Sequence, residues 1–308
     1  GMSELVIGLT LVGFGTSLPE LVTSLQALQQ GAVGLSIGNV IGSNVANIML
    51  VLGTAAIIAP IMTSPNAMAR DGLVMVSITV LFAILLWIDG FSRATGFLMV
   101  ALLMAYLAAS VWLDRRTETP VAVVHEETAE VFEKRDGLWT AIALAVGGAI
   151  SIIFGAQFLV QGGTAAARAF GVSETVVGIS ILAVGTSLPE LVTSIVAARR
   201  GKSDVALGNV LGSNIFNILG ILGVSAAVIP FSVNAPVDLA LDGVAQTQAL
   251  MQSVVTTADM QALGLSVVLL GLFAYSGRHI ARWEGLFLLA VYSLYLGVRF
   301  VLMPGTGG

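Results

Sequence analysis

The sequence contains one ten-residue stretch twice: GTSLPELVTS stands at residues 15–24 and again at residues 185–194. The two copies are 170 residues apart (185 minus 15). Each lies in an apolar stretch long enough to cross a bilayer, and each carries one carboxylate, Glu20 or Glu190. A charged side chain at the centre of a bilayer costs ~2.5–3.5 kcal/mol on insertion scales, so two such carboxylates need a partner.

A second motif follows each copy at the same offset. GNVIGSN occupies residues 38–44, and GNVLGSN occupies residues 208–214. The surrounding blocks, 3–60 and 173–230, align without a gap. The chain therefore contains an internal duplication.

The composition indicates a membrane protein. Of 308 residues, 56% are hydrophobic and only 10% are charged, whereas about 25% are charged in soluble domains. Long apolar runs recur from end to end, which predicts an all-α polytopic membrane protein rather than a barrel of short alternating strands. The chain has no cysteine, which excludes disulfides, thiol chemistry and thiolate metal sites.

We expect nine transmembrane helices in three parts: an N-terminal repeat (1–113), a mostly acidic linker (114–136) and a C-terminal repeat (137–308). The expected helices are residues 3–28, 36–60, 72–89, 95–113, 137–163, 173–198, 204–229, 260–276 and 284–303. The longer connection in the second half, around 238–257, is expected to hold a short interfacial helix.

The basic residues predict the orientation. With successive loops on alternate sides, ten Lys and Arg residues collect on one side and three on the other. The positive-inside rule then places the 114–136 linker in the cytoplasm and the C-terminus outside.

The two motif helices are five crossings apart, so they enter the membrane from opposite sides. This predicts an inverted-topology repeat of two five-helix halves, as in many secondary transporters, with Glu20 and Glu190 near the midplane. The helix at 137–163 has no counterpart before the first motif. We therefore expect that the first helix of the N-terminal repeat is missing from this chain.

Residues with side-chain oxygen atoms stand close to each glutamate in the sequence. Thr16 and Ser17 precede Glu20 by four and three residues, so the three side chains share one helical face. Pro19 removes a backbone donor and frees the carbonyl of Gly15. The second copy repeats the pattern with Thr186, Ser187, Pro189 and Glu190.

The second motif adds hydroxyl and amide oxygens. Serine and asparagine stand four residues apart, on one helical face, in both halves; the pairs are Ser43 with Asn47 and Ser213 with Asn217. Asn44 and Asn214 are expected to point about a quarter-turn away. Carboxylate, hydroxyl, amide and carbonyl oxygens are the ligands that hard cations such as Ca²⁺ and Na⁺ prefer.

The counter-charge for the glutamates is expected to be a mobile cation or a proton. No lysine or arginine lies near the glutamate within either motif helix, and both histidines, His125 and His279, fall in predicted loops. One alternative is a pair of protonated glutamates that only holds helices together. An intramembrane hydrolase using Ser17 or Ser187 would lack a general base, so we expect no enzyme activity and no cofactor.

With GTSLPE in each half, each followed by GNxxGSN, the sequence resembles the sodium/calcium exchanger family, and most of all its short prokaryotic members. The resemblance covers nearly the whole chain. It implies ten helices in two inverted halves, four clustered ion sites at the midplane, and a gating pair of helices that slides across the core. By the family pattern the cation ligands are Glu20, Glu190, Thr16, Thr186, Ser17, Ser187, Ser43, Ser213 and Asn47, with backbone carbonyls near Gly13 and Ala183.

One ligand position departs from the pattern. In similar exchangers the position of Asn217 can be an aspartate, and the amide removes a charge. The change bears on how many Na⁺ or H⁺ ions are countertransported.

The leading hypothesis is a secondary antiporter that exchanges Ca²⁺ for Na⁺ by alternating access at one midplane site. The alternatives are an H⁺-coupled or other divalent-cation exchanger, and a cation-binding form that does not transport because its first helix is missing. The expected partners are the lipid bilayer and the transported cations, with no nucleic acid. The expected location is the inner (plasma) membrane of a bacterium or archaeon.

Overall fold

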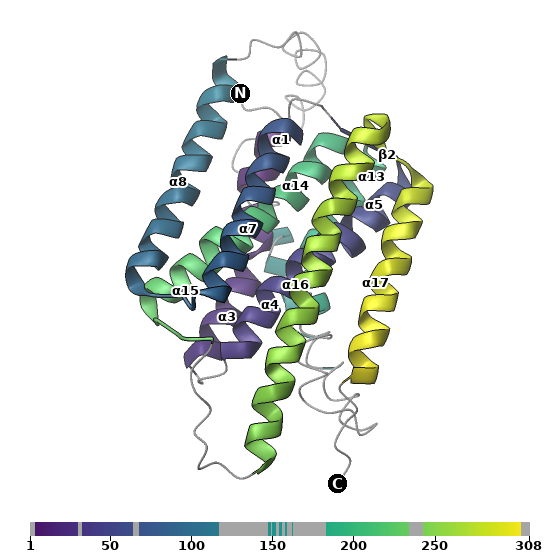
Figure 1. Ribbon diagram of the computed structural model, residues 1–308. Coiled ribbons are helices and arrows are strands. Elements are labelled where there is room, and N and C mark those ends of the chain that lie inside the picture. Colours follow the sequence, from purple (N-terminus) through teal and green to yellow (C-terminus); the bar gives the residue numbers. More distant parts are fainter. Residues whose placement is uncertain are drawn as a thin grey trace.

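The protein is a bundle of helices, several of them broken, in the computed structural model of the chain (Figure 1). The structure describes residues 4–29, 33–63, 68–116, 183–233 and 243–302, together with isolated positions between 147 and 162. Outside these residues lie most of the predicted helix at 137–163, the start of the one at 173–198 and most of the 114–136 linker.

In the first half, a broken helix carries the first motif and a second one carries the GSN motif. The broken motif helix consists of α1 (Glu4–Ile7), the π-helical η1 (Gly8–Val12), α2 (Gly13–Thr16) and α3 (Leu18–Gln29). The GSN helix consists of α4 (Val33–Ala46), the π-helical η2 (Asn47–Leu52) and α5 (Gly53–Ile58). The π-helical η3 (Met68–Gly72) leads into α7 (Leu73–Trp87), and α8 (Arg93–Arg116) completes the half.

The second half repeats this order. Its motif helix consists of α12 (Ala183–Thr186) and α13 (Leu188–Arg199), and its GSN helix of α14 (Ser203–Ile215), the π-helical η5 (Phe216–Leu222) and α15 (Gly223–Val228). Two long helices follow, α16 (Gly243–Gly277) and α17 (Arg282–Leu302). The expected separate interfacial helix is wrong for the described residues 243–257, because they form the continuous first part of α16.

Proline breaks both motif helices at the same place. The first bends by 41° between Leu5–Thr16 and Leu18–Gln29. Pro19 has no N–H for the carbonyl of Gly15, and it fits the first turn of the new helix, where no donor is needed. In the second half, α13 likewise has its proline in the first turn, after Ser187. The break gives Glu20 and Glu190 places in the first turn of α3 and α13.

The two halves pack on each other reciprocally. Helix α8 packs on α15, and α17 packs on α5; in Figure 1 these two pairs flank the molecule on opposite sides. Glycines permit both crossings. A Cβ atom on Gly96 would lie 2.7 Å from the carbonyl oxygen of Gly223, and one on Gly285 would lie 2.6 Å from that of Gly53. The same small-residue contact thus occurs once in each direction.

The ends of the GSN helices are tied to the opposite pair of long helices. After α5, the strand β1 (Ile61–Met62) pairs antiparallel with β2 (His279–Ile280), between α16 and α17. After α15, the N–H of Phe231 donates to the carbonyl of Phe91, between α7 and α8, at 3.2 Å. The two-residue ladder of β1 and β2 is a small departure from the predicted all-α fold.

The duplication extends past Pro230, with a changed offset. Asp89 and Arg278 both adopt left-handed backbone conformations, with φ of 53° and 56°, in the turns before α8 and α17. The positions 278 minus 89 and 282 minus 93, the starts of α17 and α8, both give an offset of 189. The second half therefore holds 19 extra residues (189 minus 170) between the GSN helix and this turn.

Five helices of the described chain are long and apolar enough to cross a membrane, or six if the bent motif helix counts as one span. They agree in position with the predicted segments beginning at 3, 36, 72, 95, 204 and 260. Helix α17 matches the last predicted segment in position. The outer helices expose apolar side chains such as Phe97 (65%) and Leu272 (60%). The GSN helices are instead buried, which puts them at the centre of the bundle.

Candidate functional site

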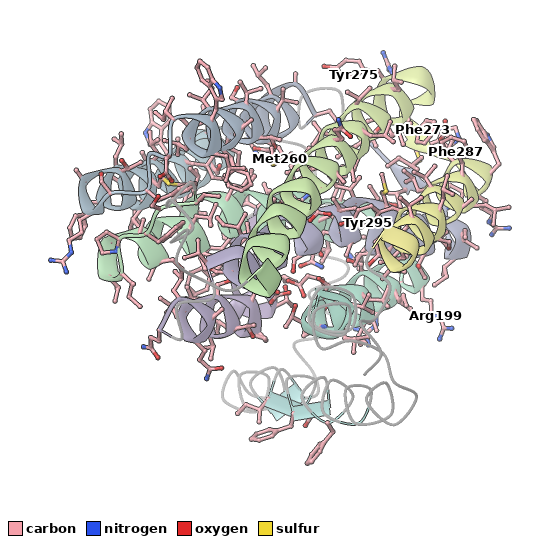
Figure 2. The ribbon with its side chains drawn as sticks, turned by 60° about the horizontal axis from the view of Figure 1, so that its bottom comes forward. Arg199, Met260, Phe273, Tyr275, Phe287 and Tyr295 are labelled. Carbon is pink, nitrogen blue, oxygen red and sulfur yellow. The ribbon has the colours of Figure 1, made fainter. Side chains whose placement is uncertain are left out.

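Both glutamates lie at the centre of the molecule with no exposed surface. Glu20 and Glu190 are each 0% exposed, and the two carboxyl groups interact electrostatically with each other. Figure 2 shows oxygen atoms gathered between the helices of the first half and those of the second, beside α16. The two motif helices thus bring like charges together inside an apolar protein, an arrangement that favours a bound cation.

The hydroxyl groups of the first motif reach the second half. Ser17 Oγ donates to Glu190 Oε1 at 2.8 Å. Thr16 Oγ1 lies 3.5 Å from Ser213 Oγ, and Ser213 Oγ donates to the carbonyl oxygen of Gly13 at 3.2 Å. Each partner lies more than 170 residues away in the sequence, so the two halves build one site together.

The second copy of the GTSLPELVTS motif likewise contacts the first half. The side chains of Thr186 and Ser187 lie beside the Glu20 carboxyl group. Each copy of the GTSLPELVTS motif therefore places hydroxyl groups beside the glutamate of the other copy. Sequence reasoning expected these hydroxyls to line the same helical face as their own glutamate and did not foresee the exchange between halves.

The first half approaches α14 closely enough to form this site because glycine stands at the contact. A Cβ atom on Gly212 would lie 2.3 Å from the carbonyl oxygen of Leu9, closer than real Cβ contacts allow. Gly13 also lies against the backbone of Ser213, where a Cβ atom would be 2.9 Å from the nitrogen. Small residues at helix contacts allow backbones to meet in this way.

The amide side chains correct one expectation. Asn214 does not point away from the site: Asn47 Nδ2 donates to Asn214 Oδ1 at 3.2 Å. A residue a quarter-turn from Ser213 still meets Asn47, because the two GSN helices pack against each other where η2 meets α14. Asn44 does turn away, as expected, and donates to the carbonyl of Val40 in its own helix at 2.6 Å.

Many polar atoms at this centre have no hydrogen-bond partner among the residues that the structure describes. They include both carboxyl oxygens of Glu20, Oε2 of Glu190, Oγ of Ser43 and Ser187, Oδ1 of Asn47, and both side-chain polar atoms of Asn217. Buried polar groups in native proteins are rarely left without a partner, and such atoms require an explanation. Because most of them are oxygens, a bound cation is a suitable partner.

Two further asparagines hold the motif helices, and the prediction missed them. Asn39 Nδ2 donates to the carbonyl oxygen of Glu20 at 3.2 Å and to Ser24 Oγ at 3.0 Å. Asn209 Nδ2 makes the same pair of bonds to Glu190 and Ser194, at 3.2 and 2.9 Å. The signal was present in the sequence, since these asparagines and serines belong to the duplicated motifs at the same offset.

The two backbone carbonyls predicted as ligands, near Gly13 and Ala183, differ in what the structure shows of them. The carbonyl of Gly13 faces the site through its bond with Ser213. Ala183 begins α12, which packs on α4, but its own part in the site stays a prediction.

The donor set selects the kind of ion. In the described part of the chain, no group of three or more His, Cys, Asp or Glu side chains could hold a metal ion. Any cation here would take two carboxylates and otherwise hydroxyl, amide and carbonyl oxygens. That set suits Ca²⁺ and Na⁺ better than Zn²⁺ or Cu²⁺, which usually take nitrogen or sulfur.

Comparison with known proteins agrees with this chemistry. Residues 1–112 and 140–301 match the family model described as sodium/calcium exchanger protein. The sodium/calcium exchanger MaX1 of Methanosarcina acetivorans is 35% identical, over 98% of this chain and 90% of its own length. The inner membrane protein YrbG of Escherichia coli is 36% identical, over 75% of this chain and 71% of its own.

Solved structures of the sodium-calcium exchanger NCX_Mj have the same fold. One of them, soaked with 10 mM Na⁺ and zero Ca²⁺, superposes with a TM-score of 0.72 at 34% identity, covering 96% of this chain and 87% of that one. Both motifs, the helical fold and the match along nearly the whole length show that this chain belongs to the sodium/calcium exchanger family.

Proposed function

We propose that this chain is a secondary antiporter that exchanges Ca²⁺ for Na⁺ across a membrane by alternating access. Both ions use the one site between the two halves. The observation that carries the proposal is the pair of fully buried glutamates, surrounded by oxygen atoms that lack partners among the described residues. The names of the exchangers to which the chain is similar support the choice of ions.

Charge balance explains why either ion load can cross. Two glutamates carry two negative charges, which one Ca²⁺ or two Na⁺ ions neutralise. Loaded with either, the site is close to neutral and tolerable inside the membrane, whereas the empty site buries two like charges. The protein can therefore change its access readily when loaded and only at a cost when empty, and this difference couples the two fluxes.

The ligand set that we propose comes from both halves. Calcium takes about six to eight oxygen ligands, more than one half can easily supply. The proposed ligands are Glu20, Glu190, Thr16, Thr186, Ser17, Ser187, Ser43, Ser213, Asn47 and Asn217, with the carbonyls of Gly13 and Ala183.

We further propose that the halves are inverted repeats within nine transmembrane helices. The reciprocal packing of α8 on α15 and of α17 on α5 supports this, since a two-fold axis in the membrane plane exchanges the two contacts. The basic residues favour a cytoplasmic 114–136 linker and an outer C-terminus. The similarity to an Escherichia coli inner membrane protein supports the inner membrane.

The test is radiolabelled Ca²⁺ uptake into proteoliposomes that contain the purified chain. We expect an outward Na⁺ gradient to drive uptake, and a pH gradient alone to drive none. Uptake with the pH gradient alone would instead identify an H⁺-coupled exchanger, since the same glutamates can carry protons. Absence of Ca²⁺ binding to the wild-type protein would refute the proposed site altogether.

A further inference from the structure

An asparagine ligand has an orientation problem that a carboxylate does not have. Its side chain ends in an oxygen, which attracts a cation, and an NH₂ group, which repels one; the two ends have nearly the same shape. A site that uses asparagine must therefore hold the amide with its oxygen toward the ion. The structure contains a device for this on one of the two asparagines of the site.

Asn47 is held by its neighbour in the other half. Its Nδ2 donates to Asn214 Oδ1 at 3.2 Å, and both side chains are buried, at 0% and 1% exposed. Its Oδ1 has no hydrogen-bond partner among the described residues. The NH₂ end is thus occupied, and the oxygen end remains available for an ion.

Met75 of α7 sets the orientation of Asn214 in turn. Asn214 Nδ2 donates to Met75 Sδ at 3.7 Å. A thioether sulfur accepts hydrogen bonds weakly and donates none. The NH₂ group of Asn214 therefore faces the sulfur, which leaves the Asn214 oxygen toward Asn47. The two hydrogen bonds thus run in one direction, from Asn47 to Asn214 and from Asn214 to Met75. They leave Asn47 Oδ1 without a partner among the described residues.

The other half lacks this arrangement. Asn44, which corresponds to Asn214, donates to its own helix at Val40. Both polar atoms of Asn217 are without a partner within the described ranges. The two asparagine positions of the site are therefore not equivalent: one amide is oriented in advance, and the other is not.

A sequence difference between the halves explains part of this asymmetry between Asn47 and Asn217. Each half has a buried aspartate hydrogen-bonded to a tyrosine of the following helix, Asp71 with Tyr106 and Asp259 with Tyr295. Met75 follows the first aspartate by four residues, and Leu263 stands in that place after the second. Leucine offers no acceptor that could orient an amide.

We infer that Asn214 is a positioning residue that turns the Asn47 side-chain oxygen toward the transported cation. The inference rests on the proposed function, in which Asn47 is a cation ligand. Asn214 itself touches no ion in this account; it acts through Asn47. Nothing in the duplicated motif distinguishes it from Asn44, and only the contact between the two halves does so.

The test measures the Ca²⁺ Kd of purified protein by calorimetry for matched substitutions at the two asparagines. Asn214→Leu removes the acceptor and keeps the number of side-chain heavy atoms, with bulkier methyl groups at the end. We expect Ca²⁺ binding to weaken about tenfold, as the loss of one buried hydrogen bond implies. Asn214→Asp keeps an oxygen that can only accept, and we expect it to bind Ca²⁺ at least as tightly as the wild type. Asn44→Leu and Asn44→Asp are the controls for volume and for added charge.

A packing role for Asn214 predicts the opposite order. Leucine would then be tolerated, and the buried charge of Asn214→Asp would be harmful. Equal effects of leucine at Asn214 and at Asn44, or equal gains from aspartate at both, would overturn the inference. A wild-type protein that binds no Ca²⁺ would refute the proposed function instead, which keeps the two failures apart.

Met75→Leu gives a second measurement that does not alter the polar centre itself. The change nearly conserves volume, so we expect normal folding. Loss of the sulfur acceptor leaves Asn214 free to turn, and we expect the Ca²⁺ Kd to rise about threefold, the size of an average side-chain hydrogen bond between membrane helices. An unchanged Kd in Met75→Leu, like an unchanged Kd in Asn214→Leu, would contradict the inference.

Discussion

Replacing Glu190 by glutamine removes one of the two site charges with little change of shape. Ser17 Oγ donates to Glu190 Oε1 at 2.8 Å, and the amide oxygen of glutamine can accept the same bond. Since Glu190 is fully buried, water cannot enter to supply the cation with a ligand in place of the lost carboxylate. We therefore expect Glu190→Gln to fold normally and to lose its affinity for Ca²⁺.

The size of the loss follows from the charges. A unit charge and a divalent ion about 4 Å apart attract by ~8 kcal/mol at an effective dielectric constant of about 20. Desolvation of the buried carboxylate offsets several kcal/mol of this attraction. A net loss of about 4 kcal/mol weakens Ca²⁺ binding about a thousandfold.

Thermal unfolding with and without Ca²⁺ measures this effect. A ligand that binds only the folded state stabilises it as its concentration exceeds Kd. We expect Ca²⁺ to raise the Tm of the wild type and to leave that of Glu190→Gln unchanged. Without cations, we expect the variant to be the more stable protein, because it no longer buries two like charges. An equal Ca²⁺-dependent rise of Tm in both proteins would show that the Glu190 charge does not contribute to Ca²⁺ binding.

Two other substitutions test contacts between helices, one within the second half and one between the halves. Tyr295→Phe removes the 2.6 Å hydrogen bond to Asp259, and we expect a loss of about 1 kcal/mol in stability with transport retained; an unchanged Tm would contradict it. In Gly96→Ala the new Cβ would lie 2.3 Å from the nitrogen of Ala227, so we expect overpacking to cost about 1–3 kcal/mol. Gly297→Ala is its control, since nothing lies within 4 Å there, and a gain of about 0.5–1 kcal/mol in helix stability is expected; equal effects of the two substitutions would count against the close crossing.

The features that follow from local sequence could be predicted. Pro19 marked the break in its helix, because a proline acts on residues within one turn. Helical spacing placed the hydroxyls on the face of their own glutamate but did not show that they lie beside the glutamate of the other half. The membrane helices were visible because a long apolar run is itself a local property. The duplication also showed which two segments would resemble each other.

The parts that depend on contact between the halves could not be predicted. Ser17 bonds to Glu190, and Asn47 bonds to Asn214, only because the repeats pack in one particular way. The π-helical turns η2 and η5, which hold Asn47 and Asn217, have no signal that we recognised in the sequence. Such turns are frequent at functional sites.

Na⁺-driven uptake of radiolabelled Ca²⁺ tests whether the two halves make one shared site. Wild type, Glu20→Gln and Glu190→Gln are compared in proteoliposomes. We expect rapid uptake by the wild type and none by either variant, because each glutamate lies beside the hydroxyls of the opposite half. Substantial uptake by either variant would mean that one half can carry Ca²⁺ without the other's carboxylate, and it would contradict the shared site.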